Sequence, residues 1–133
     1  MSRENVETLR RSNASFNRRD RAGVYAEFHP HVEWRDLQHP PDSPERLHGI
    51  PPLLAVWDQW EDAFDEFTAE IEEYIDAGDY VLALTHWRAT GKDSGLAIDL
   101  RTVDVYEFAD GKIVRATVGY ADKDAALANL GLE

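Results

Sequence analysis

One carboxylate in this sequence has the setting that acid/base chemistry needs. Asp104 belongs to an alternating row of a predicted strand, and side chains on alternate positions face the same way. The other members of that row are mostly apolar: Leu96, Ile98, Leu100, Thr102 and Tyr106. An inward-facing Asp104 would lose its hydration, which raises a carboxyl pKa above its usual value of about 3.9. Asp104 is therefore the candidate catalytic acid or base; the alternative is a structural bond to a core Tyr, Trp or Thr, or to an arginine across the sheet.

Large aromatic side chains recur on the predicted inward faces of strands and helices. Buried indole N–H and phenol O–H groups need hydrogen-bond partners, and walls of such residues suit a flat apolar ligand. Plain core packing is the alternative, and it is the expectation for Trp60. The candidate ligand-binding residues are Trp34, Trp57, Trp87, Thr102, Tyr106, Val118 and Tyr120.

The histidines do not form a recognisable metal-binding pattern. None of the pairs among His29, His31, His39, His48 and His86 has the i, i+4 spacing of a helical zinc site. His86 is predicted to face outward, as a surface or interface residue. No glycine-rich phosphate loop or cofactor motif is present, so we predict neither a metal nor a cofactor.

One further acid is placed at the end of a predicted strand. Asp36 follows the strand expected at 31–35. A role in capping the following loop is the expectation for this residue, with a place at the mouth of a pocket as the alternative.

The first half of the chain has helical periodicity. Apolar spacing predicts helices over 3–18 and 21–28, with Asp20 capping the second and Pro30 ending it. The short strand at 31–35 comes next, followed by a proline-rich irregular loop over 37–49. Pro51 and Pro52 suit the first turn of a third helix, whose broad apolar face extends to Phe64.

From Phe67 onward the apolar period changes to two. This pattern predicts a strand up to a turn at 76–79 and further strands over 80–90, 96–108 and 112–120. A helix over 123–130 is predicted to end at Gly131, which suits a left-handed cap. Helices followed by sequential antiparallel strands indicate an α+β fold, with the helices on one face of a curved sheet. We interpret 1–133 as one domain.

Composition restricts the classes of partner. The net charge of −12 disfavours nucleic acid and anionic membranes. There is no cysteine for disulfides or thiolate chemistry, and no apolar run approaches the roughly 18 residues of a membrane span. We therefore expect a cytoplasmic protein with no nucleic-acid or membrane partner.

Seven short runs spread over the chain share a specific order and spacing. They are 16–20 (FNRRD), 30–34 (PHVEW), 47–50 (LHGI), 77–81 (AGDYV), 94–95 (SG), 108–113 (FADGKI) and 126–132 (ALANLGL). In this arrangement the chain resembles the SnoaL-like members of the nuclear transport factor 2-like superfamily. The resemblance implies a cone-shaped fold: a curved antiparallel sheet, about three N-terminal helices packed on its concave face, and a short C-terminal helix.

The resemblance does not supply a complete catalytic set. Asp104 matches the acid that helps hold the oxyanion in ketosteroid isomerases, but the base of those enzymes falls at Trp34 and their phenolic donor near Ser12. The acid of SnoaL-type polyketide cyclases falls at Val118. Arg101 and Asp104 lie on opposite faces of one strand, so they do not reproduce the set of the epoxide-opening branch.

Three functions stay open at this point. The first is a cofactor-free isomerase, cyclase or hydratase acting on a small apolar or polycyclic carbonyl compound. The second is a non-catalytic domain that binds such a compound, and the third is a dimeric scaffold with a filled core. The outer row Arg101, Val103 and Val105 mixes charged and apolar groups, which suits a homodimer interface.

Overall fold

The computed structural model describes residues 2–39, 41 and 43–131. Its helices are α1 (Ser2–Asn17), α2 (Arg21–Tyr25), α3 (Ile50–Ala63) and α4 (Lys123–Leu130). Its strands are β1 (Phe28–Asp36), β2 (Arg46–His48), β3 (Phe64–Ala77), β4 (Tyr80–Gly91), β5 (Ala97–Ala109) and β6 (Lys112–Tyr120). Pro40 of the proline-rich loop and Leu132 of the last sequence run lie outside the described residues.

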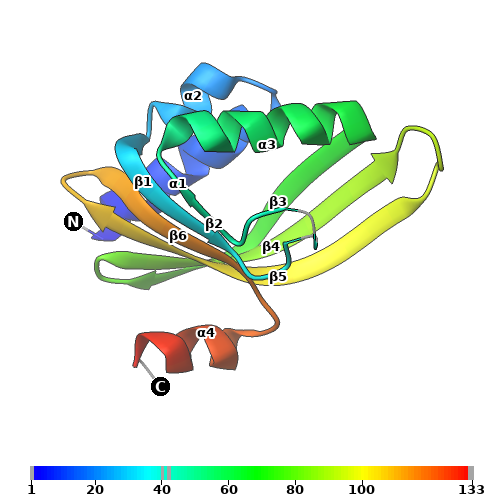
Figure 1. Cartoon of the computed structure of the whole chain (residues 1–133). Helices are drawn as coiled ribbons and strands as arrows, with labels where there is room; N and C mark the ends of the chain where they lie inside the picture. The colour runs from blue at the N-terminus through cyan, green and yellow to red at the C-terminus, as the bar shows by residue number, and fades with distance from the viewer. Residues whose placement is uncertain (1, 40, 42, 132–133) are drawn as a thin grey trace.

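The strands form one curved sheet in the order β2-β1-β6-β5-β4-β3 (Figure 1). Neighbours are antiparallel except β1 and β6, which run parallel. The prediction of a purely antiparallel sheet is therefore wrong at this pair. Two parallel neighbours require a long connection between them, and here the chain from β2 to β5 forms the connection between β1 and β6. The α+β class is confirmed.

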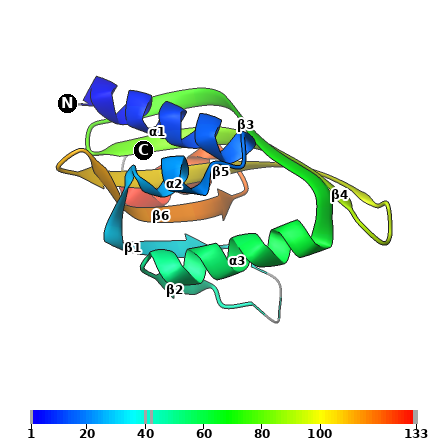
Figure 2. The ribbon, with the colours of Figure 1, turned by 90° about the horizontal axis from the view of Figure 1, so that it is seen from above.

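Three helices cover one face of the sheet, as predicted. Figures 1 and 2 show α1, α2 and α3 together over the concave face, with the short α4 on the opposite side. The prediction placed only the N-terminal helices on this face and did not assign a face to the C-terminal helix. In the described part of the chain, no helix is both long and apolar enough to cross a membrane.

The run 16–20 joins α1 to the sheet. The side-chain amide of Asn17 accepts from the backbone N–H of Ala69 (3.0 Å) and donates to the carbonyl of the same residue (2.8 Å). The Arg19 guanidinium stacks on the Phe67 ring, 3.6 Å from its centroid, and donates to the Phe67 carbonyl. These contacts occupy the outer edge of β3, which has no strand beyond it.

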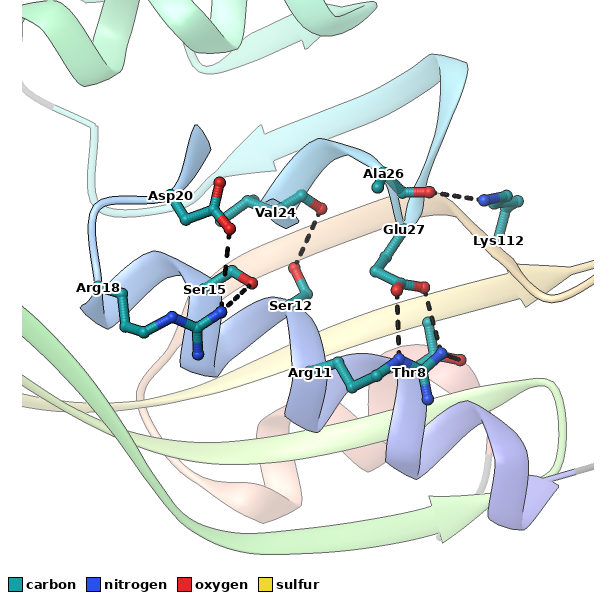
Figure 3. A network of polar contacts seen from close by, with 10 residues as sticks. All are labelled: Thr8, Arg11, Ser12, Ser15, Arg18, Asp20, Val24, Ala26, Glu27 and Lys112. Atoms are coloured by element: carbon teal, nitrogen blue, oxygen red, sulfur yellow. Dashed lines mark hydrogen bonds and ion pairs between the residues drawn. The ribbon is translucent and has the colours of Figure 1, made fainter. Parts of the chain in front are cut away.

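Polar contacts fix the turn between α1 and β1 (Figure 3). Asp20 caps α2 by accepting from the amide of Gly23 (3.0 Å), as predicted. The hydroxyl of Ser12 donates to the carbonyl of Val24 (3.3 Å), and Arg11 pairs with Glu27. These contacts hold the short helix α2 against α1 and set where β1 begins.

Strand β1 begins earlier than the sequence analysis predicted. Phe28, expected at the end of a helix, is the first residue of the strand, and Pro30 lies inside it. The register with β6 shifts between Phe28 and Glu33, so Pro30 sits where the ladder is interrupted and no strand amide is required. β2 likewise falls within the predicted irregular loop, where it pairs with β1.

Helix α4 buries part of the outer sheet face. Ala126 is fully buried against Leu82, Val103 and Val105, with Leu127 and Leu130 packed beside them. Val103 and Val105, predicted to lie in a homodimer interface, are therefore covered by the chain's own C-terminal helix. The alternation that placed them outward is right, but it carries no information about what covers that face.

The register between β5 and β6 shifts at Gly119. Val103 is opposite Tyr120, whereas Val105 is opposite Thr117, so β6 carries extra residues at this point and forms a β-bulge. Gly119 has φ = 99°, a conformation that favours glycine. A Cβ at this position would lie 2.8 Å from Cγ of Gln38.

Replacing Gly119 by alanine tests this bulge. We expect Gly119→Ala to lower the free energy of unfolding by about 2–4 kcal/mol, because backbone strain and crowding against Gln38 add. Gly78→Ala is the matched control, since Gly78 also has positive φ but nothing lies within 4 Å of its added Cβ. It should cost only about 1 kcal/mol. Equal losses for the two variants in urea denaturation would contradict this account.

Candidate functional site

A cavity of about 490 Å³ lies between the N-terminal helices and the concave face of the sheet. It is lined by α1, α2 and α3, by the inner faces of the strands, and by the loop that follows β1. Six of the seven predicted ligand-binding residues line it: Trp34, Trp57, Trp87, Thr102, Tyr106 and Val118.

The aromatic rings of the cavity wall meet around Phe16. Its ring centroid lies 5.0 Å from that of Trp57 and 5.8 Å from that of Trp87. Trp60, expected to be plain core, also lines the cavity, with its ring 6.0 Å from that of Trp87. Phe16 is not among the predicted ligand-binding residues, although it falls within the helix predicted at 3–18. Its position one turn after Asn13 and two turns after Leu9, which both line the cavity, is the signal that could have found it.

The mouth of the cavity is formed partly by residues that sequence reasoning missed. They come from the loop after β1 and from the later turns of α3: Gln38, His39, Ser43, Pro44, Val56 and Gln59. Asp36 also lines the cavity, and its carboxylate accepts from the amide of Gln38 (2.8 Å). Asp36 therefore has both of the positions considered for it, at the loop cap and at the mouth.

Asp104 is fully buried directly behind this wall. Its Oδ1 atom accepts from the backbone N–H of Gly119 (2.9 Å) and from the hydroxyl of Thr102 (3.0 Å). The Thr102 hydroxyl in turn accepts from the indole N–H of Trp87 (3.2 Å). Asp104 is not itself among the residues that line the cavity, which corrects the prediction that it faces the ligand directly. Thr102 and Gly119 do line it, so one layer of atoms separates the carboxyl from the cavity.

The surroundings of Asp104 favour its protonated form. Burial raises the pKa of Asp104 to about 6, the hydrogen bonds from Gly119 and Thr102 oppose the rise, and the Asp36 charge adds to it. The Thr85 hydroxyl donates instead to the carbonyl of Ala83 (3.3 Å). Among the described residues, Oδ2 of Asp104 has no hydrogen-bond partner. No charged partner from the described part of the chain neutralises Asp104, so the alternative of an arginine pair is wrong and the Thr102 hydrogen bond is the structural contact.

The phenols of the cavity remain protonated at neutral pH. Burial raises the pKa of Tyr25 to about 12. Burial, and next the charge of Asp104, raise the pKa of Tyr106 well above its ordinary value. The indole Nε1 of Trp57 is buried without a partner in the described part of the chain. The cavity is thus apolar with a few neutral donors, which suits a neutral molecule with oxygen acceptors.

Tyr120 does not belong to the cavity. The β-bulge at Gly119 reverses the alternation of β6, so Tyr120 turns to the outer face. There it packs against the cluster under α4, and its hydroxyl accepts from the side chain of Asn129 (2.5 Å). The prediction of a ligand contact for Tyr120 is therefore wrong, because strict alternation fails across a bulge.

A group of possible metal ligands lies on the outer sheet face. Ligand atoms of Glu70, Glu72 and His86 lie within 4.8 Å of one another. However, Arg101 pairs with Glu72 (3.0 Å), and Nε2 of His86 is 2.6 Å from Asp99. These contacts already use ligand atoms of Glu72 and His86. His86 is on the outer face as predicted, but it is only 3% exposed because these neighbours cover it.

Comparisons with known proteins agree on the fold. The family model of the SnoaL-like domain matches residues 9–116. A nuclear transport factor 2-like protein of unknown function from Burkholderia pseudomallei is 26% identical, with 94% of this chain and 95% of that chain covered and a TM-score of 0.78. None of the curated proteins matches the chain.

Two further solved structures share the fold at lower identity. TerC, crystallised with polyporic acid, is 22% identical, with 96% and 97% of the two chains covered and a TM-score of 0.77. A protein assigned as a SnoaL-like polyketide cyclase from Jannaschia sp. is 18% identical, with 86% and 83% covered and a TM-score of 0.73.

The burial of Asp104 predicts a specific pH dependence of stability. Because its folded pKa lies above its unfolded value of 3.8, the folded state binds more protons between about pH 4 and 6, and stability falls as pH rises through that window. Asp104→Asn keeps an acceptor for Gly119 and Thr102 but cannot ionise. From pH 4 to 7, the free energy of unfolding of the wild type should fall by about 3 kcal/mol more than that of the variant. Parallel urea-denaturation profiles for the two proteins would show that Asp104 does not titrate in this range.

Proposed function

The chain belongs to the SnoaL-like domain family, and on that basis we propose that it binds a small, flat, largely apolar carbonyl compound in the aromatic cavity. The observation that carries the proposal is the cavity of about 490 Å³ with its wall of aromatic rings. A domain with a filled core has no such space, so this observation disfavours the scaffold alternative.

The chemistry of the cavity wall supports this class of ligand. Phe16, Trp60 and Trp87 present ring edges and faces at centroid separations of 5.8–6.2 Å, the range in which aromatic groups attract one another. Tyr25 and Tyr106 remain neutral hydrogen-bond donors. TerC, which has the same fold, was crystallised with polyporic acid.

Acid/base catalysis is the second candidate function, and the state of Asp104 favours it. A carboxyl with a pKa of about 6 is mostly ionised at pH 7 and is a stronger base than an ordinary carboxylate. The Thr102 hydroxyl connects it to the cavity. In this proposal the carboxylate takes a proton, through Thr102, from the carbon next to the ligand's carbonyl, which leaves an enolate.

The homodimer and the cytoplasmic location remain predictions. With Val103 and Val105 covered by α4, a homodimer through the outer sheet face would use the charged part of that face around Arg101.

Binding can be tested with the naphthyl ketone prodan, 6-dimethylamino-2-propionylnaphthalene, whose emission shifts to the blue in apolar surroundings. We expect saturable binding that also raises the melting temperature by an amount that grows with the logarithm of the ligand excess. Trp87→Ala should weaken the affinity about tenfold, because the ring that stacks on the ligand is lost. Tyr80→Ala, an aromatic change outside the cavity, is the control and should bind normally.

The opposite pattern would support the scaffold with a filled core. In that case prodan would give no saturable signal, and Trp87→Ala would cost the full 3–5 kcal/mol of a packed core ring.

Catalysis can be tested without knowing the natural substrate. The flat ketone 2-tetralone carries acidic hydrogens next to its carbonyl, and their exchange in D₂O is followed by loss of the proton NMR signal. We expect the protein to accelerate the exchange, with a rate that rises through about pH 6 as Asp104 ionises. Asp104→Asn should abolish the acceleration, while Asp93→Asn on the β4–β5 hairpin should retain it. Equal rates for Asp104→Asn and wild type would leave binding as the function.

A further inference from the structure

The inner row of β5 does not end at the cavity. It continues toward the β4–β5 hairpin as three exposed apolar side chains, namely Leu96 (68% exposed), Ile98 (39%) and Leu100 (42%). Among the described residues these are the large apolar side chains left exposed. The sequence analysis placed all three inward with Thr102 and Tyr106. Ile98 and Leu100 share that face of β5 and Leu96 directly precedes the strand, whereas the β4–β5 hairpin extends beyond the helices over the concave face (Figures 1 and 2).

This apolar strip, Leu96, Ile98 and Leu100, is continuous with the cavity. Leu100 itself lines the cavity, and its cross-strand partner Trp87 belongs to the aromatic wall. Ile98 is the next residue outward on the same face, opposite Ala89. A molecule that leaves the cavity along this wall therefore passes from Leu100 onto Ile98 and then Leu96.

The strip is held in place and nothing in the described chain covers it. The amide of Lys92 in the hairpin donates to the carbonyl of Ala63 at the end of α3 (3.0 Å), which ties the hairpin to the helix. β6 reaches only as far as Val103, where Tyr120 is paired, so 97–102 of β5 has no strand on that side.

We propose that the strip binds an apolar chain attached to the flat group held in the cavity. The natural ligand is then a flat carbonyl compound with a hydrocarbon side chain, rather than a compact ring system alone. This inference rests on the proposed function and narrows its ligand class.

The dimensions of the strip favour a ligand chain over a second protein. It is one side chain wide and three long, whereas a stable protein interface needs about 800 Å² from each partner. The adjacent residues Asp99 and Arg101 point to the other face and are already engaged, Asp99 with His86 and Arg101 with Glu72. A single hydrocarbon chain matches a narrow apolar path that begins inside a cavity.

Two probes with the same head group test the inference. Prodan carries a three-carbon acyl chain, and laurdan carries a twelve-carbon chain on the same dimethylaminonaphthalene. A fully buried methylene improves affinity about fourfold, and a chain lying on an open strip keeps one side in water. We therefore expect wild type to bind laurdan at least tenfold more tightly than prodan, measured by fluorescence titration at submicromolar probe.

The double variant Leu96→Ser/Ile98→Ser should remove most of the laurdan advantage and leave prodan affinity unchanged. Ala97→Ser, between the two positions but on the opposite face, is the matched control and should keep the advantage. Light scattering of each protein reports whether the strip instead joins two copies.

The outcomes separate this inference from the function on which it rests. If prodan fails to bind, the proposed function fails. If prodan binds but laurdan binds no more tightly, or if laurdan keeps its higher affinity in the double variant, the inference that the strip binds a hydrocarbon chain is wrong. A loss of molecular mass in the double variant would assign the strip to contact with a second copy and overturn the inference.

Discussion

The hydrogen bond between the amide of Gly119 and the buried carboxyl of Asp104 is the contact on which the rest of the site depends. It fixes the β-bulge in β6, and three regions are organised around that bulge. On the inner side, Thr102 bridges Asp104 to Trp87. At the mouth, the amide of Leu37 donates to the carbonyl of Val118 (2.9 Å), and the Gln38 side chain donates to the carbonyl of Gly119 (2.9 Å). Beyond the bulge, Tyr120 turns outward toward α4.

The same contact explains why a destabilising group sits in the core. An unpaired buried carboxylate opposes folding, yet no apolar residue of similar size could accept from both Gly119 and Thr102. Both hydrogen bonds use Oδ1, so the other carboxyl oxygen, Oδ2, takes no part in holding the bulge. In the proposed proton transfer Oδ1 has both roles: it accepts from the Gly119 amide in the bulge, and the Thr102 hydroxyl connects it to the cavity.

Sequence periodicity predicted much of this fold, because each element obeys a local rule. The alternation in β4 and β5 placed Trp87, Thr102 and Tyr106 on one inner face, and the capping residues Asp20 and Gly131 mark helix ends as expected. The predictions failed where contacts between segments distant in the sequence determine the structure. The bulge at Gly119 moved Tyr120 to the other face, α4 covered Val103 and Val105, and pairing with β6 drew Phe28 into a strand. The bulge has one local signature, the isolated glycine inside the strand predicted at 112–120, whereas the other two changes depend on a partner far along the chain.

The parallel pairing of β1 with β6 also affects the order in which the fold can form. Glu33 and its ion-pair partner Arg115 are 82 residues apart in the sequence. At a synthesis rate of about 5–20 residues per second, β1 is therefore made roughly 4–16 s before β6, with which it pairs in the complete sheet. Until then only the three-residue β2 can pair with it. Closing so long a loop also slows folding of the complete chain. Through this interval the strand that carries Trp34 exposes both an apolar face and an open edge, which makes the nascent N-terminal half the segment most in need of protection from aggregation.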